Sequence, residues 1–188
     1  MTRSRALGTV FVTRDALFTR EECQQVVQEA EQAAGAKGWS TSRHYSVPTT
    51  DIPLHTLPEA LSWFNRALQV QLFPMLAEQF GHLGVSADKL RIHDAFIVKY
   101  DAAARRELPV HTDQSQYSFT IALNSVTEYT AALSLRHSEN QFDQIRRARG
   151  QLSRGSISWR SSHCKWHPIH HRCIHVFGCR IIFAEGND

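Results

Sequence analysis

His111 and Asp113 are the residues of this chain whose types and spacing best suit metal chemistry. They stand two residues apart in LPVHTDQSQYSFTIALN, residues 108–124, a stretch whose second half alternates as a β-strand does. On an extended backbone, residues i and i+2 project from the same face. An imidazole and a carboxylate so placed can supply two ligands of the two-histidine, one-carboxylate iron(II) triad, which leaves coordination positions open. Because the chain has 11 histidines, a lone His-x-Asp triplet also arises by chance.

The segment around this pair resembles the prolyl and lysyl hydroxylase branch of the 2-oxoglutarate and iron(II)-dependent dioxygenases. In that family, a strand ends in a tyrosine, a short loop leads to His-x-Asp, and a Ser/Thr-rich strand closes on Leu-Asn. Here the pattern reads FIVKYDAAARRELPVHTDQSQYSFTIALN, residues 96–124. A weaker likeness includes residues 38–65, and the resemblance as a whole covers roughly residues 9–130.

The resemblance implies an activity, cofactors and site residues. The expected reaction is hydroxylation of a prolyl, lysyl or related side chain in a peptide or protein substrate, or of a small molecule. It would use O2, Fe(II), 2-oxoglutarate as cosubstrate and ascorbate as reductant. His111 and Asp113 would bind iron, Tyr100 would hydrogen-bond a 2-oxoglutarate carboxylate, and Thr120 would line its pocket. An ordinary amphipathic tyrosine at a strand end is the alternative for Tyr100.

The third iron ligand has several candidates in the last third of the chain. The family places a carboxylate-binding basic residue about ten positions after the distal histidine. His170 followed by Arg180, at the end of a Gly-x-Arg triplet, meets that spacing. Arg180 would then hold the far carboxylate through a bidentate, charge-assisted pair. The segment HPI at residues 167–169 favours His163 instead, and His167 is a further alternate. We expect His170, with the loss of a third ligand as the remaining alternative.

Two helices are expected ahead of the metal-binding stretch. Thr19 and Glu22 have the capping-box spacing, and apolar residues follow at helical intervals, which predicts a helix over residues 20–34. A second apolar stripe predicts a helix over residues 58–80, which Pro74 can kink.

From residue 90 the apolar period becomes two, which predicts strands over residues 90–100 and 117–124. In the first of these, strict alternation puts one set of residues on one face: Leu90, Ile92, Asp94, Phe96, Val98 and Tyr100. Arg91, His93, Ala95, Ile97 and Lys99 would share the other. Helices followed by strands favour an α+β fold, here a double-stranded β-helix (a cupin-like jelly roll) supported by N-terminal helices.

The length suits a single domain, residues 1–188, which divides by pattern into three parts. Residues 9–89 form the helical support and residues 90–130 hold the metal-binding strands. Residues 131–188 depart from the family, because their apolar residues follow neither a helical nor a strand period. We therefore expect a disrupted C-terminal third, with few strand pairings in residues 131–175.

A shifted reading frame would explain that departure. Permissible codons for residues 130–145, read one frame over, can encode GGTFFAALGEPIRPD, a string that such an oxygenase would contain. The nucleotide sequence tests this conjecture. A degenerate, inactive or weakly active dioxygenase-like domain is accordingly the main alternative function.

Two further classes of function come from the composition of the tail. Residues 131–188 hold 9 Lys/Arg against 4 Asp/Glu, and Cys164, Cys173 and Cys179 are interleaved with histidines. A zinc site and a basic nucleic-acid-binding tail are therefore conceivable. The cysteine spacings match no standard zinc motif, and no nucleic-acid-binding module is recognisable, so both are less favoured.

The beginning of the chain has no apolar run of signal-peptide length, and no segment approaches a membrane span. The expectation is a protein without a membrane partner, cytoplasmic by default.

Overall fold

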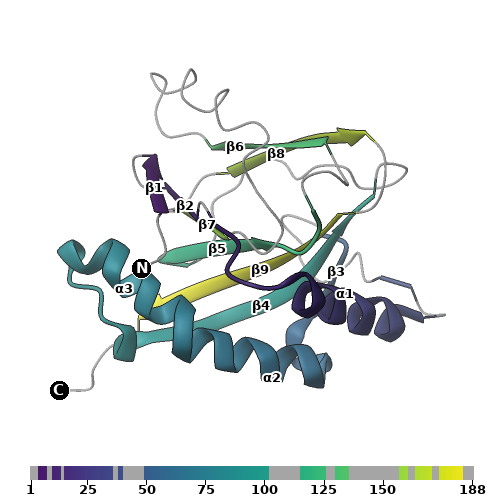
Figure 1. The fold of residues 1–188 in the computed structure, drawn as a ribbon, viewed down its shortest axis with the longest axis horizontal. Helices are drawn as coiled ribbons and strands as arrows, with labels where there is room; N and C mark the ends of the chain where they lie inside the picture. The colour runs from purple at the N-terminus through teal and green to yellow at the C-terminus, as the bar shows by residue number, and fades with distance from the viewer. Residues whose placement is uncertain are drawn as a thin grey trace.

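In the computed structural model of the chain, one large antiparallel sheet has helices on one face and a two-stranded sheet on the other side (Figure 1). The structure describes these residues: 4–7, 10–13, 15–35, 38–39, 49–101, 115–125, 130–135, 157–160, 164–170 and 174–183. For residues 4–7 and 10, and for the described residues beyond 125, it describes the backbone alone.

The large sheet has seven strands in the order β1-β2-β7-β5-β9-β4-β3, and β6 and β8 form the second sheet. The strands are β1 Ser4–Leu7, β2 Val10–Thr13, β3 Asp51–Pro53, β4 Leu90–Tyr100, β5 Tyr117–Ala122, β6 Thr130–Leu135, β7 Ile157–Arg160, β8 Cys164–His170 and β9 Ile174–Phe183. The strand predicted over residues 90–100 is confirmed, and the one predicted over 117–124 is confirmed as far as Ala122.

The first helix, α1 Arg20–Ala34, begins at the predicted capping box. The Glu22 N–H donates to the Thr19 hydroxyl at 3.1 Å, and the Thr19 N–H donates to the Glu22 carboxylate at 2.8 Å. The helix ends at Gly35, whose φ of 39° suits a residue without a side chain.

The second predicted helix, over residues 58–80, is also confirmed, with an irregular centre. It comprises α2 Pro58–Ala67, a π-helical turn η3 Leu68–Leu72, and α3 Phe73–Phe80. Pro74 lies in the first turn of α3, where its missing N–H is tolerated. Single 3₁₀ turns complete the connections: η2 Leu54–Thr56, η4 Gly81–Leu83 and η5 Ala87–Lys89.

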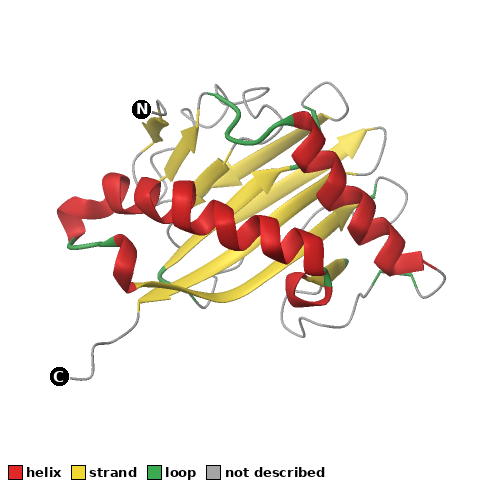
Figure 2. Ribbon diagram, turned by 60° about the horizontal axis from the view of Figure 1, so that its bottom comes forward, coloured by secondary structure: helices red, strands yellow, loops and turns green. Residues whose placement is uncertain are grey.

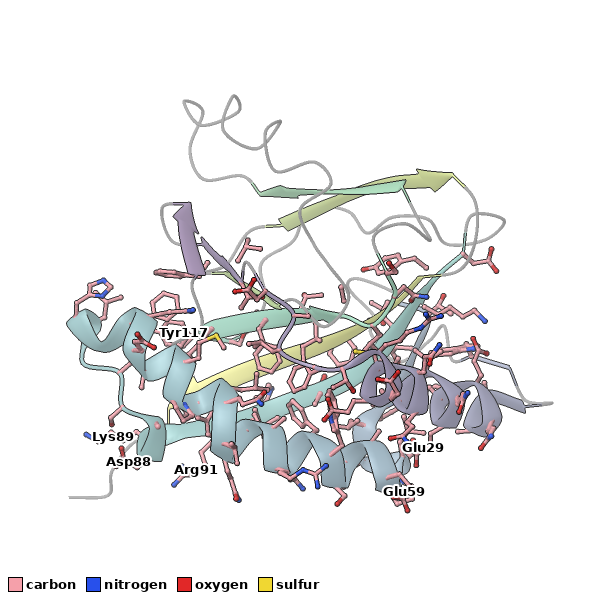
Figure 3. The ribbon with its side chains drawn as sticks, in the orientation of Figure 1. Glu29, Glu59, Asp88, Lys89, Arg91 and Tyr117 are labelled. Carbon is pink, nitrogen blue, oxygen red and sulfur yellow. The ribbon has the colours of Figure 1, made fainter. Side chains whose placement is uncertain are left out.

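The main core lies between the helices and one face of the large sheet (Figure 2). Phe64 of α2 lies 6.1 Å from Phe119 of β5, and Phe80 of α3 lies 4.7 Å from Tyr117, between ring centroids. Figure 3 shows Tyr117 beside α3. Phe119 and Ile121 belong to this core, so the alternate residues of β5 face away from the helices.

A β-bulge at His93 corrects the predicted faces of β4. Ile92 pairs with Ile181, whereas Asp94 pairs with Arg180, so one extra residue enters the ladder between them. Such an insertion reverses the faces of the residues beyond it. Leu90 and Ile92 consequently pack toward the helices together with Ile97. Strict alternation had predicted that they share a face with Phe96 instead.

The contact of Lys99 with α1 confirms the reversal. Its Nζ lies 2.7 Å from Oε1 of Glu31 and 5.3 Å from the centroid of the Trp39 ring. The Trp39 indole N–H donates to the same carboxylate at 3.1 Å. Lys99 therefore lies on the helix side of β4, and Asp94, Phe96, Val98 and Tyr100 lie on the opposite face.

The expectation of few strand pairings in residues 131–175 is wrong for the described residues. β6 pairs with β8, and β7 pairs with both β2 and β5. β9, which follows, pairs along its length with β4 on one edge and with β5 on the other. Whether the tail arose from a shifted frame stays a prediction for the nucleotide sequence.

Among the helices of the described residues, none combines the length and the apolar character needed to cross a bilayer.

Candidate functional site on the sheet face away from the helices

The face of the large sheet opposite the helices carries most of the buried polar side chains that the structure describes. Of the six buried polar or charged residues, Thr49, Asp51, Ser118 and Thr120 lie on this face or on its continuation at the β3 edge. Burying polar groups costs free energy unless they are hydrogen-bonded. Their concentration here, with the second sheet on the same side (Figure 1), marks the face as the candidate site.

Tyr100 marks one end of this face. Its side chain is only 2% exposed, and its position in β4 is opposite Ile174 of β9. On the other edge, the N–H of Lys99 donates to the carbonyl of Thr50 at 2.8 Å, which extends the β3–β4 register and puts Thr49 opposite Tyr100. The buried hydroxyl of Thr49 donates to the carboxylate of Asp51.

Thr120 and Arg180 lie toward the other end. Thr120 is 6% exposed and stands opposite Gly178, two residues before Arg180 on the same face of β9. Arg180 itself stands between Ser118 of β5 and Asp94 of β4. The register thus brings these two predicted site residues together.

Tyr100 and Arg180 occupy levels of the sheet that are far apart. Arg180 is level with Asp94, and Tyr100 is six positions after Asp94 in β4. At roughly 3.3 Å per residue this is about 20 Å along the strand. The backbone positions of Tyr100 and Arg180 are therefore not neighbours on the sheet.

His111 and Asp113 lie outside the described residues. The description resumes at Ser115, whose hydroxyl lies 2.8 Å from that of Ser118. This hydrogen bond links the segment just after Asp113 to the start of β5, beside the level of Arg180.

His170 and His167 both lie in β8, and His163 falls outside the described residues. His170 pairs with Thr130 and His167 pairs with Ala132, because an irregularity interrupts the β6–β8 ladder between these positions. Partners two residues apart in β6 share a face, so the register places both histidines on one face of the second sheet. Both remain candidates for the third ligand.

Within the described part of the chain, no three His, Cys, Asp or Glu side chains are grouped as a metal site. Cys164 begins β8 in the second sheet, whereas Cys179 lies in β9 of the large sheet, opposite Phe119. Phe119 packs toward the helices. This separation does not favour a zinc site shared by the two cysteines.

No sequence motif indicated Asp51, Thr49 or Ser118 as residues of the candidate site, and the predicted alternation of β4 did not connect Asp94 with Arg180. Asp51 begins β3, a three-residue edge strand too short to show alternation, and Thr49 lies two residues before it. The sequence signal that was available for this part of the site is the Asp in VPTTDIP, residues 47–53, which lies between two prolines.

Comparisons with known proteins find similarity in sequence to one protein and in fold to several solved structures. No family model matches the chain. A procollagen lysyl hydroxylase and glycosyltransferase of Acanthamoeba polyphaga mimivirus is 32% identical over 123 residues. The match includes 61% of this chain but only 13% of the viral protein, so the chain corresponds to a small part of that protein's length.

Three solved structures share the fold. The non-heme alpha ketoglutarate dependent carbocyclase SnoK from nogalamycin biosynthesis has a TM-score of 0.64 at 11% identity, with 92% of this chain and 79% of that chain covered. The viral collagen prolyl hydroxylase vCPH from Paramecium Bursaria Chlorella virus-1, solved with 2OG, has a TM-score of 0.60 at 10% identity, covering 93% and 96%. A Pseudomonas putida prolyl-4-hydroxylase has a TM-score of 0.59 at 11% identity, covering 96% and 95%.

The fold is therefore one found among 2-oxoglutarate-dependent oxygenases. The resemblance to the prolyl and lysyl hydroxylase branch is confirmed, by sequence for the viral lysyl hydroxylase and by fold for two prolyl hydroxylases.

Proposed function

We propose that the chain is a 2-oxoglutarate- and Fe(II)-dependent dioxygenase that hydroxylates a prolyl, lysyl or related side chain of a peptide or protein. The observation that carries the proposal is the buried polar face of the large sheet, on which Thr120 and Arg180 are neighbours. The fold shared with oxygenases supports it. We further propose that the two sheets are the two layers of a double-stranded β-helix, the jelly roll of cupin-like proteins.

The residues of this face suit 2-oxoglutarate. A hydroxyl and a guanidinium both donate hydrogen bonds that a carboxylate accepts, and the hydrogen bonds of an Arg–carboxylate pair are charge-assisted. We assign the far carboxylate of the keto acid to Arg180, with Thr120 lining the same pocket. Tyr100 lies about 20 Å away along the sheet, which is farther than a five-carbon keto acid reaches. Its phenol is therefore not assigned to this pocket, although the family resemblance implies a hydrogen bond to a 2-oxoglutarate carboxylate.

The donor set suits iron(II). His111, Asp113 and one histidine of the tail, His170 or its alternates His167 and His163, would complete a two-histidine, one-carboxylate triad with open positions. Iron and 2-oxoglutarate, when bound, supply C–H hydroxylation by O2 coupled to decarboxylation of the keto acid to succinate. The chain's own residues hold the cosubstrate, orient it and exclude water, and ascorbate would keep the iron reduced.

The inactive-domain alternative loses part of its structural basis. It rested on missing strands in the second half of the fold, yet β6 to β9 are paired in the described residues. An inactive domain would have the same fold but no turnover, so an activity measurement distinguishes it from the hydroxylase.

Succinate release with iron(II), O2, ascorbate and 2-oxoglutarate is the decisive assay, run with and without proline- and lysine-containing peptides. We expect release that His111→Ala and Asp113→Ala abolish, together with iron(II) binding. His82→Ala and Asp15→Ala, at exposed positions, are the matched controls and should retain both. No release by the wild type under any of these conditions would reject the hydroxylase and favour the inactive domain.

A further inference from the structure

Asp94 occupies an unexpected position because of the bulge at His93. Without the extra residue, Asp94 would lie on the helix side of β4 with Ile92. With it, Asp94 stands directly opposite Arg180 on the candidate-site face. A local irregularity thus brings a half-buried carboxylate to the arginine that the proposed function assigns to the cosubstrate.

The other register neighbour of Arg180 is neutral. Ser118 is 4% exposed, and its hydroxyl is within hydrogen-bond distance, 2.8 Å, of the Ser115 hydroxyl. Of the two residues directly opposite Arg180, Asp94 is therefore the one that carries charge.

We propose that Asp94 is a positioning residue that orients the guanidinium of Arg180 toward the far carboxylate of 2-oxoglutarate. Opposed residues on one face of an antiparallel pair have Cβ atoms about 4.5–5.5 Å apart, which suits a pair of opposite charges. A guanidinium has five N–H donors, so it can be held by a protein carboxylate and still bind the ligand's carboxylate. Fixing a long side chain before binding lowers the entropy lost on binding.

This inference rests on the proposed function and specifies which residue makes its cosubstrate site selective. Its consequence is a preference for a keto acid with a second carboxylate. 2-Oxopentanoate has the same five-carbon chain and the same metal-chelating end as 2-oxoglutarate but lacks the far carboxylate. Comparing the two ligands isolates the contribution of Arg180 and of any residue that acts through it.

The test is calorimetric binding of both keto acids to the full chain loaded with Mn(II), which does not turn over. The wild type should prefer 2-oxoglutarate. Asp94→Asn should raise the Kd of 2-oxoglutarate about tenfold, as expected for the loss of one charge-assisted hydrogen bond. The Kd of 2-oxopentanoate should stay within about twofold. Arg180→Ala should remove the preference, and adding Asp94→Asn to it should cost nothing further.

Two variants complete the design. Asp88→Asn, at an exposed residue in the turn before β4, is the matched control and should bind as the wild type does. Asp94→Glu keeps the charge and should retain part of the preference, and it replaces Asp94→Asn if that variant fails to fold.

The possible outcomes distinguish a failure of the Asp94 inference from a failure of the proposed function on which it rests. Equal weakening of both keto acids in Asp94→Asn would show a structural role and overturn the inference. Tighter binding of 2-oxoglutarate would also overturn it, because Asp94 would then compete with the ligand. A wild type that binds neither keto acid would reject the proposed function itself, and a preference that survives Arg180→Ala would reject the assignment of Arg180.

Discussion

Thr49 and Asp51 show how much the candidate-site face depends on single hydrogen bonds. Asp51 is fully buried, and a buried carboxylate is costly unless donors surround it. The Thr49 hydroxyl, itself 4% exposed, is one such donor. Tyr100 lies opposite Thr49 in the extended register, so this pair supports the Tyr100 end of the candidate-site face.

Thr49→Val replaces that hydroxyl with a methyl group of similar size. We expect the free energy of unfolding to fall by roughly 1–3 kcal/mol, because the buried carboxylate loses one hydrogen-bond donor. Urea unfolding measures the change. Thr56→Val is the control: its hydroxyl donates to the Pro53 carbonyl at 2.7 Å but is exposed, so water replaces it. Equal losses in the two variants would contradict a special role for the buried bond.

Tyr117 gives a pH-dependent prediction. Burial raises the pKa of its phenol above the ordinary value of 10.0. Below that value both the folded and the unfolded chain are protonated here, so the residue adds no pH dependence. Above it the unfolded chain ionises first and binds fewer protons, so stability falls as pH rises toward the folded-state pKa.

Tyr117→Phe should remove this alkaline loss. Urea unfolding of both proteins at about pH 8 and about pH 11 should show that the wild type loses more stability between the two pH values. The ring contact with Phe80, at 4.7 Å, is retained in the variant, so the two should differ least at the lower pH. Parallel losses in the two proteins would show that the phenol ionises equally in both states.

Single residues also set the limit of prediction from sequence. The period of two in residues 90–100 correctly predicted β4 and its length. It assigned the wrong face to Leu90 and Ile92, because one inserted residue at His93 reverses every face beyond it. A bulge is a pairing property of two strands, so the alternation of one strand cannot reveal it.

At the scale of elements, a side chain of α1 caps the N-terminus of α2. Leu57, the N-cap of α2, has no side-chain hydrogen bond to the helix. The carboxylate of Glu29 in α1 accepts from the N–H groups of Glu59 and Ala60, at 3.0 and 2.7 Å. Figure 3 shows Glu29 and Glu59 close together at this junction. A negative group at a helix N-terminus is also favoured by the helix dipole.

Glu29→Gln keeps the size of the side chain and removes its charge. We expect a loss of about 1 kcal/mol, and of about 1–2 kcal/mol for Glu29→Ala, which leaves both N–H groups uncapped. Thermal unfolding gives the ranking of the two variants. Glu78→Gln, at an exposed position of α3, should change little. A charge effect of Glu78 as large as that of Glu29 would argue against the cap.

Local signals predicted the helices well because their causes are local. The capping box of Thr19 and Glu22 involves residues three apart, and the apolar stripes repeat within each helix. The cap from Glu29 was not foreseen, because it joins residues about 30 positions apart. The strands β7 and β9 of the tail were missed for a related reason: they pair with β2, β4 and β5, which lie far away in the sequence.

At the scale of the whole molecule, the last described strand occupies a central place. β9 lies between β4 and β5 in the large sheet, so it joins the strand before the His-x-Asp segment to the strand after it. Arg180, the residue proposed to bind the keto acid, and the register that brings it to Thr120 both depend on this strand. A tail that looks degenerate by sequence pattern therefore supplies a central strand of the large sheet.

Removing residues 174–188 should consequently prevent folding. Without β9, the backbone N–H and C=O groups of β4 and β5 that face it lose their partners, and unpaired backbone groups within a sheet are costly. We expect this shortened chain to lack the cooperative thermal transition of the full chain in circular dichroism and to fail to bind 2-oxoglutarate. The control is a chain ending at Phe183, which keeps all of β9 and should unfold cooperatively. If instead the chain ending at residue 173 unfolded cooperatively and bound the keto acid, neither the central position of β9 nor the assignment of Arg180 to the site would stand.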